Sequence, residues 1–335
     1  MDSEGLPRMA QAAMDHWPAL AEAAGLPPEV DGLRVLVHRD QPGVRRAVLA
    51  LVAGGQEVIL KHAAEPWQPE HFDGCLAAMQ GARAAMQGGA PRLLARLPGG
   101  QAALIARAPG RSLEELMEAA ADPQEMRRLF RRGAEWLGHY QRATIGPPTA
   151  FDPSGMIARH ARLREDIRQG RLALPEPARF LALSEAFAAE AGAVAGREVA
   201  RAAAHGDLHP GNLLLDPPHA TVAIDFNPVR LAWVGHDLAD YLLAFLTRFL
   251  RPGQQPEGGW LPAPERRAFA LGHGSDPFDD PVLEPLLLAA IARKWVRLAS
   301  GDGQIAGSRA ERLAALIRVA GRARPRLWAD LPGAE

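Results

Sequence analysis

The sequence predicts an α+β protein with two lobes: a small antiparallel five-stranded β lobe over residues 1–106 and a larger, mainly helical lobe over 107–335. Two observations predict this division. Short, alternating apolar runs fill much of the first lobe, and their connections are too short for the crossovers that parallel strands need. Beyond them, one long segment after another has apolar residues at helical spacing. The segment Ala-Pro-Gly-Arg at 108–111 separates the two patterns and is the predicted hinge.

The elements of the first lobe follow in order. Residues 7–25 have helical spacing and end at a glycine. Three strands are predicted next, at 33–37, 47–52 and 57–61. They are joined by a polar loop over 38–46 and a Gly-Gly turn over 54–55. A helix over 69–88 and a second hairpin, with strands at 91–97 and 101–105, complete the lobe.

The second lobe reads as a series of helices. Ser112 is the predicted cap of the first, with Glu115 at the capping-box position. The predicted helices span 113–119, 123–144, 154–169, 176–199, 236–251, 283–299 and 308–324. Residues 252–282 are rich in Pro and Gly and are predicted to be irregular.

Composition excludes several classes of protein. The 335 residues carry a formal net charge of -1, which favours neither nucleic-acid nor anionic-membrane partners. Cys75 is the only cysteine, so no intrachain disulfide forms, and a reducing compartment is expected. No apolar stretch approaches the roughly 20 residues of a membrane span, and the acidic N-terminus is unlike a secretory signal. We expect a cytoplasmic protein whose oligomeric state is open.

The residues with the strongest chemical signal lie between 204 and 241. His205, Asp207 and Asn212 match the spacing H-x-D-x-x-x-x-N, and Asp225 follows an apolar strand. In kinases an Asp orients the acceptor hydroxyl, while an Asn and a second Asp bind Mg²⁺ on ATP. We therefore predict Asp207 as a catalytic residue, Asn212 and Asp225 as metal ligands, and ATP and Mg²⁺ as cofactors. The alternative is a surface turn of ordinary polar residues.

Lysine and asparagine are scarce, which sharpens this interpretation. Lys61 and Lys294 are the only lysines, and both asparagines, at 212 and 227, lie in the segment just described. Lys61 ends the third predicted strand, where a kinase holds the α- and β-phosphates of ATP. Its predicted carboxylate partner on the next helix is Glu70, with Asp73 as the alternative. His209 is predicted to donate a hydrogen bond to the transferring phosphate, or else to pack on its neighbouring proline.

The chain resembles the aminoglycoside phosphotransferase family of the protein-kinase-like superfamily. The resemblance is carried by HGDLHPGN at 205–212, IDF at 224–226 and GHDLA at 235–239. It implies a bilobal, protein-kinase-like fold, a bracing role for Asp237 as a helix N-cap, and adenine binding by backbone groups at Ile105 to Arg107. Asn227 stands where protein kinases have Gly, and the loop at 38–46 has a single glycine.

The resemblance implies a hydroxyl acceptor of small size without naming it, since relatives phosphorylate aminoglycosides, choline-like alcohols, homoserine, sugars and fructosamines. Carboxylates and aromatic rings within 252–282 favour a cationic amino sugar or amino alcohol. They are Glu257, Glu265, Asp276, Asp279, Asp280, Trp260 and Phe278. A solvated acidic loop is the alternative. For the chain as a whole, the alternatives are a kinase that acts on a protein and a non-catalytic nucleotide-binding module.

Overall fold

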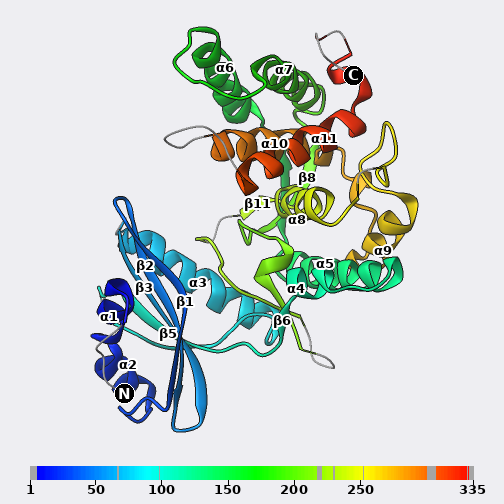
Figure 1. Ribbon diagram of the computed structural model, residues 1–335. Helices are drawn as coiled ribbons and strands as arrows, with labels where there is room; N and C mark the ends of the chain where they lie inside the picture. Colours follow the sequence, from blue (N-terminus) through cyan, green and yellow to red (C-terminus); the bar gives the residue numbers. More distant parts are fainter. Residues whose placement is uncertain are drawn as a thin grey trace. The chain divides into compact units, whose positions relative to one another are not determined.

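The structure is a computed structural model that describes residues 6–65, 68–97, 99–216, 221–228, 231–251, 253–299, 307–329 and 331. Contacts among Cα atoms divide the chain into two compact units (Figure 1). The first unit comprises Met1–Arg111 and Leu214–Val229, and the second comprises Ser112–Leu213 and Arg230–Glu335. The chain therefore leaves the first unit just beyond the predicted hinge and later returns to it for a short segment.

The first unit is built on a five-stranded sheet, as predicted. The strand order is β1-β2-β3-β5-β4, and every neighbouring pair is antiparallel. The strands are β1 (Gly32–Gln41), β2 (Val44–Ala53), β3 (Gln56–Glu65), β4 (Leu93–Arg96) and β5 (Ala102–Ala106). The turn at 54–55 joins β2 to β3, so the Gly-Gly signal marked the hairpin correctly.

The predicted polar loop over 38–46 is wrong. The strands β1 and β2 continue through it, and only Pro42 and Gly43 form the turn. Gln41 pairs with Val44 in the sheet register, and the Nε atom of Arg45 lies 3.5 Å from a carboxylate oxygen of Asp40. Polar side chains do not prevent pairing in a hairpin whose end is exposed on both faces.

Helices cover this sheet. They are α1 (Arg8–Met14), α2 (Trp17–Ala24) and α3 (Pro69–Met86). The single helix predicted over 7–25 is two helices, because Pro18 lies in the first turn of α2, where a proline is tolerated, and would break a continuous helix. Trp17 and Leu20 of α2 pack into one apolar core with Leu49 and Leu60 of the sheet.

The segment Leu214–Val229, which belongs to the first unit, packs closely against two glycines of that unit. Gly110 has a φ of 96° and lies against the carbonyl group of Leu215, so a side chain there would meet the backbone. A Cβ atom at Gly74 of α3 would lie 2.8 Å from Pro228. A three-stranded sheet, β10-β9-β6, accompanies this segment. Its strands are β6 (Arg111–Ser112), β9 (Leu213–Leu215) and β10 (Thr221–Ala223).

The second unit is mainly helical, as predicted. Ser112 caps α4, since its Oγ atom accepts a hydrogen bond from the Glu115 N–H over 3.1 Å. The helices are α4 (Leu113–Glu118), α5 (Pro123–Ala143), α6 (Ser154–Arg168), α7 (Pro177–Ala193), α8 (Gly235–Arg248), α9 (Ala263–His273), α10 (Leu283–Ala299) and α11 (Ser308–Ala323). Short 3₁₀ turns lie at Pro210–Asn212, Pro277–Asp279 and Pro325–Leu327.

Two parts of the second unit differ from the prediction. A sheet of order β11-β8-β7 lies within it, and its strands are β7 (Gly146–Ala150), β8 (Glu198–Ala203) and β11 (Leu231–Trp233). The helix predicted over 176–199 therefore ends early, at Ala193 of α7. The segment 252–282, predicted to be irregular, contains α9.

Most residues of helix α8 are buried within the second unit. Its Tyr241 and Phe245 stack on Phe130 of α5, with ring centroids 5.5 and 3.9 Å apart. The Tyr241 hydroxyl donates a hydrogen bond to the Phe130 carbonyl oxygen over 3.0 Å. This packing fixes the helix that carries Asp237 and Asp240.

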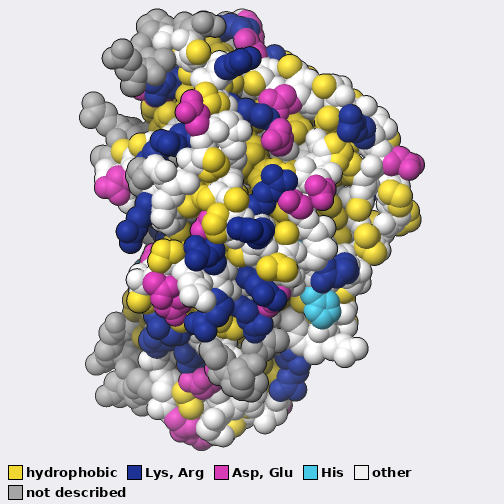
Figure 2. Space-filling model, turned by 90° about the vertical axis from the view of Figure 1, so that its right-hand side faces the viewer, with side chains coloured by type: hydrophobic (Ala, Val, Ile, Leu, Met, Phe, Trp, Pro, Cys, Tyr) yellow, Lys and Arg dark blue, Asp and Glu magenta, His cyan; other side chains and the backbone are white. Residues whose placement is uncertain are grey.

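Surface charge is mixed. On the face drawn in Figure 2, basic and acidic side chains are both exposed, and the Lys and Arg side chains gather mainly in its lower middle part. No helix among the described residues is both long and apolar enough to span a membrane. The cytoplasmic location stays a prediction.

Candidate active site

The predicted site residues fall into two groups. Asp207, His209 and Asn212 belong to the second unit, and Lys61 and Asp225 belong to the first. Asp225 does so because it lies in the returning segment.

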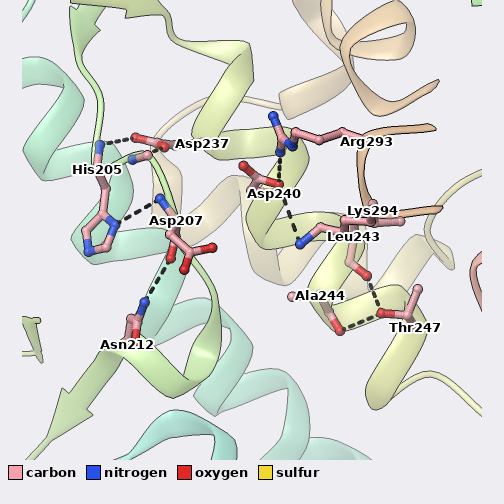
Figure 3. Close-up of polar contacts among 11 residues, drawn as sticks. His205, Asp207, Asn212, Asp237, Asp240, Leu243, Ala244, Thr247, Arg293 and Lys294 are labelled. Atoms are coloured by element: carbon pink, nitrogen blue, oxygen red, sulfur yellow. Dashed lines mark hydrogen bonds and ion pairs between the residues drawn. The ribbon is translucent and has the colours of Figure 1, made fainter. Parts of the chain in front are cut away.

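The catalytic loop of the second unit, residues 205–212, is held by Asp237. The backbone N–H of His205 donates to one carboxylate oxygen of Asp237 over 2.7 Å, and that of Gly206 donates to the other over 3.0 Å (Figure 3). The Asp237 side chain is buried, with a residue exposure of 4%. The expected bracing role agrees with these contacts, but the N-cap assignment is wrong, because α8 begins at Gly235 and Asp237 lies inside its first turn.

The backbone of Asp207 is fixed from both sides. Its N–H points to the Nδ1 atom of His205 at 3.4 Å, and its carbonyl oxygen accepts a hydrogen bond from the Asn212 side-chain amide over 2.9 Å. His205 is fully buried, and its ring packs edge-on against Trp136. The half-buried Asp207 carboxylate makes no hydrogen bond or ion pair with another described residue. It can therefore accept a hydrogen bond from a ligand hydroxyl.

His209 carries a proton on a defined nitrogen. Its Nδ1 atom accepts a hydrogen bond from the Gly211 N–H over 3.1 Å, so the neutral ring has its proton on Nε2. Burial lowers the pKa of His209 from its ordinary value, while the carboxylates of Asp207 and Glu114 act in the opposite direction. A neutral ring with an Nε2–H group can donate a hydrogen bond to a phosphate oxygen.

Glu114 of α4 is a neighbour of this loop that the sequence did not indicate. Its Oε2 atom lies 3.9 Å from the His209 Nδ1 atom, and it forms an ion pair with Arg248 at the end of α8. Arg248 also lies 3.5 Å from Glu118. These ion pairs connect α4 and α8 beside the catalytic loop. No local motif surrounds Glu114, so only the fold brings it here.

A second group that the sequence missed lies one turn further along α8. Asp240 accepts a hydrogen bond from Arg293 over 2.5 Å, and its Oδ1 atom is 3.7 Å from the Lys294 Nζ atom (Figure 3). Burial lowers the pKa of Lys294, while the nearby carboxylates of Asp240 and Asp207 act to raise it. Lys294 therefore lies within electrostatic range of Asp207. The scarcity of lysine in this chain was the available signal.

In the first unit, Lys61 at β3 forms an ion pair with Asp225. Asp225 follows β10 with a φ of 59°, in the left-handed region that Asp tolerates better than most residues. Its side chain is 55% exposed. The positive φ of this segment is thus at Asp225 and not at Asn227, the residue that stands where protein kinases have Gly.

Glu70 does not pair with Lys61. Glu70 lies on the exposed side of the first turn of α3, and no ion pair joins these two described side chains. Asp73, the alternative, forms an ion pair with Arg96 over 2.7 Å. The α3 residue within electrostatic range of Lys61 is Cys75, whose pKa is raised chiefly by burial and lowered in part by Lys61.

The hinge residues are engaged in the sheet. Ile105 pairs with Ile59 of β3 and with Leu93 of β4. The N–H of Arg107 donates to the Glu57 carbonyl oxygen over 3.3 Å, and its guanidinium pairs with the Glu57 side chain over 2.6 Å. The backbone hydrogen bond is long, and adenine binding at Ile105 and Arg107 stays a prediction.

Carboxylates of residues 252–282 have partners within the chain. Glu265 lies 3.4 Å from Arg127, and Asp276 lies 2.7 Å from Arg266. Burial raises the pKa of Asp280, which accepts a hydrogen bond from a backbone N–H over 3.0 Å. Two of the five predicted acidic groups are thus paired with arginines, whereas the Oδ2 atom of Asp280 is buried without a hydrogen-bond partner among the described residues.

Comparison with known proteins identifies the family. The model of the phosphotransferase enzyme family matches residues 37–270. The chain belongs to this family. A comparison with curated proteins finds no match.

Solved structures of this kind share the fold. A spectinomycin phosphotransferase in complex with ADP and spectinomycin has a TM-score of 0.62 and 11% identity, over 92% of this chain and 97% of that chain. An aminoglycoside phosphotransferase has a TM-score of 0.61 and 16% identity, over 94% and 98%. A glucosamine kinase has a TM-score of 0.55 and 17% identity, over 94% and 81%. The predicted kinase-like fold is confirmed.

The oxygen donors of this family member suit a hard divalent cation. Mg²⁺ in phosphoryl-transfer sites takes only one or two protein ligands and completes its shell with phosphate oxygens and water. The Asn212 amide nitrogen is used by the loop, which leaves its Oδ1 atom as the donor, and Asp225 offers a carboxylate. Among the described residues no group of three or more His, Cys, Asp or Glu forms a self-sufficient metal site. Asn212 in the second unit and Asp225 in the first thus each offer an oxygen of the kind that Mg²⁺ binds, and their role as metal ligands stays a prediction.

Proposed function

We propose that this phosphotransferase uses Mg·ATP and transfers the γ-phosphate to a hydroxyl group of a small molecule. The observation that carries the proposal is the state of Asp207. Its backbone is held by His205 and Asn212 in a loop braced by Asp237, while its carboxylate has no partner among the described residues. An immobilised carboxylate of this kind suits the orientation of an acceptor hydroxyl.

In the proposed reaction, Asp207 accepts a hydrogen bond from the acceptor hydroxyl and aligns its oxygen with the γ-phosphorus. The acceptor oxygen forms a new bond to phosphorus, the bond to the β–γ bridging oxygen breaks, and ADP leaves. The hydroxyl proton passes to Asp207 and then to solvent. The Nε2–H group of His209 donates a hydrogen bond to the phosphoryl group that moves, which stabilises its negative charge.

The remaining roles concern the nucleotide. Lys61 holds the α- and β-phosphates, for which it must exchange its ion pair with Asp225 for phosphate oxygens. Asn212 and Asp225 hold Mg²⁺, which supplies positive charge to the phosphates when bound. Backbone groups at Ile105 and Arg107 bind adenine. Two structures of similar fold support this nucleotide class: the spectinomycin phosphotransferase was solved with ADP, and an amicoumacin kinase was solved with AMP-PNP and Ca²⁺.

A substrate screen tests the reaction. The protein is incubated with Mg·ATP and a pooled metabolite extract to which aminoglycosides and amino alcohols are added, and new phosphorylated species are identified by mass spectrometry. Asp207→Asn should form none of the species seen with the wild type and should still bind ADP. Asp166→Asn, the same chemical change at an exposed ion pair on α6, is the matched control and should retain activity. Undiminished transfer by Asp207→Asn would refute the assignment.

A separate measurement tests the proposed role of Lys61 in nucleotide binding. Lys61→Met removes the cation from the Asp225 carboxylate and from the phosphates. We expect ADP affinity, measured by calorimetry with Mg²⁺ present, to fall at least about tenfold, since the lost contacts are charge-assisted. Equal ADP affinity of variant and wild type would remove Lys61 from the proposed site.

A further inference from the structure

A small pocket lies in the second unit between α6, α8 and α10. Its volume is about 90 Å³, roughly that of three water molecules. Leu163, Leu286 and Ala290 give it an apolar floor. Four basic or imidazole side chains also line it: Arg159, His160, His236 and Arg293. None of its described lining residues is an Asp or Glu.

The two arginines give this pocket its charge. Arg159 lies on the exposed side of α6, with no ion-pair partner among the described residues, and Arg293 faces it from α10. His160 is neutral at pH 7, because burial lowers its pKa to about 4, and its Nδ1 atom is 3.1 Å from the Ser184 hydroxyl. The pocket therefore presents arginine cations and a neutral imidazole to a ligand.

Helix α8 contributes residues both to the pocket and to the support of the loop at 205–212. His236 and Ala239 line the pocket, whereas Asp237 between them braces the loop. Arg293, which also lines the pocket, is joined through Asp240 to Lys294, and Lys294 is in electrostatic range of Asp207. The residues of α8 that line the pocket and the one that supports the loop thus lie within the same two helical turns, roughly 10 Å in length.

The charged groups of the pocket lining are positive. Arg159 and Arg293 are its cations, and Arg293 is paired with Asp240, whereas the carboxylates of Asp207 and Asp237 belong to the loop and its support. A cationic group in the pocket would meet two guanidinium groups, while Glu265 and Asp276, once expected to attract it, are paired with arginines elsewhere in the unit.

We infer that this pocket binds a carboxylate group of the acceptor, so that the substrate class is a hydroxylated acid of about sugar size. The inference rests on the proposed function and deepens it. One or two guanidinium groups hold the carboxylate over the apolar floor. A hydroxyl group several bonds away then reaches Asp207.

Equilibrium binding of three matched sugars tests this inference without any transfer step. Glucuronate, glucose and glucosamine carry similar hydroxyl groups and differ in charge. Each is titrated by calorimetry into the protein saturated with Mg·ADP. We expect glucuronate to bind at least about tenfold more tightly than glucose, and glucosamine to bind more weakly than glucose. Glucosamine affinity equal to or above that of glucuronate, or no glucuronate binding, would overturn the inference.

A pair of variants assigns the selectivity to the pocket. Arg159→Gln removes a cation at an exposed position and should preserve the fold. It should weaken glucuronate binding by about three- to tenfold and leave glucose binding unchanged. Arg162→Gln, an exposed arginine on the same helix that does not line the pocket, is the control and should change neither. Equal effects of the two variants on glucuronate would refute the assignment.

The outcomes separate the two proposals. If glucuronate binds selectively but the metabolite screen detects no transfer, the proposed function fails and the carboxylate pocket stands. If the screen finds transfer to an amine or a neutral sugar and none to an acid, the function stands and the inference about the acceptor fails.

Discussion

Removal of the Asp237 carboxylate should destabilise the protein through two backbone groups. In Asp237→Ala the N–H groups of His205 and Gly206 lose the oxygens that they reach at 2.7 and 3.0 Å. A buried donor without a partner costs about 1–3 kcal/mol, so the two together cost roughly 2–6 kcal/mol. At about 2–4 °C per kcal/mol for a folding unit of roughly 150–250 residues, the melting temperature of the second unit should fall by roughly 4–24 °C.

The same change should slow transfer more than it weakens nucleotide binding. The loop that Asp237 braces carries Asp207, whereas Lys61 and Asp225 lie in the other unit. The assays are thermal unfolding followed by circular dichroism, ADP binding by calorimetry, and the rate of phosphate transfer. Asp237→Asn keeps the shape and one accepting oxygen, so its effect should lie between those of the wild type and Asp237→Ala.

Asp122 supplies the matched control. Its carboxylate also accepts two backbone hydrogen bonds, from Gln124 at 2.7 Å and Glu125 at 2.9 Å, but it caps α5 in full contact with solvent. Water can replace the lost acceptor in Asp122→Ala, so its melting temperature should change much less. If both variants melt at the same temperature, burial of the Asp237 bonds is not what stabilises the loop.

Three other predictions concern stability and reactivity. Gly133→Ala should destabilise by about 2 kcal/mol or more in urea unfolding, because its Cβ atom would overlap the buried Tyr241 hydroxyl, and an unchanged midpoint would refute this. Stability should fall as pH drops from about 6.5 toward 4, because burial lowers the imidazole pKa values of His62, His160 and His273 to about 4. Protonation of each buried ring costs up to about 3 kcal/mol of folding free energy. A urea midpoint that stays constant from pH 7 to 5 would contradict this. Cys75 should react slowly with iodoacetamide at pH 7.5, since burial raises its pKa, and mass spectrometry showing the rate of a free thiol would disprove this.

Local patterns carried the successful sequence predictions. The Gly-Gly pair at 54–55 and the alternating residues on either side of it specify a hairpin without help from the rest of the chain. The loop from His205 to Asn212 is likewise local, because its backbone contacts join residues two and five positions apart, while its catalytic role stays a prediction. Interactions between neighbours in sequence are visible in the sequence itself.

The failures have a common physical cause, which is pairing between distant segments. Residues 198–203 (EVARAA) have a composition that favours helix, yet they form the strand β8 because β7 and β11 pair with it on either side. The Lys61–Asp225 ion pair joins residues 164 positions apart, and Arg293 reaches Asp240 across 53. No spacing rule indicates such contacts, so the ion pair between Lys61 and Asp225 was not predicted, and a pairing of Lys61 with Glu70 stays a prediction that this structure does not show.

The first unit is made of two segments that are distant in sequence, and this affects its folding during synthesis. Residues up to Arg111 leave the ribosome long before Leu214–Val229, which completes the unit. At elongation rates of about 5–20 residues per second, the surfaces of α3 and the hinge that receive this segment wait roughly 5–25 s for it. The nascent sheet must stay soluble in that interval while Lys61 has no Asp225 to pair with. A chaperone that binds nascent chains would therefore meet this protein with its first unit still incomplete.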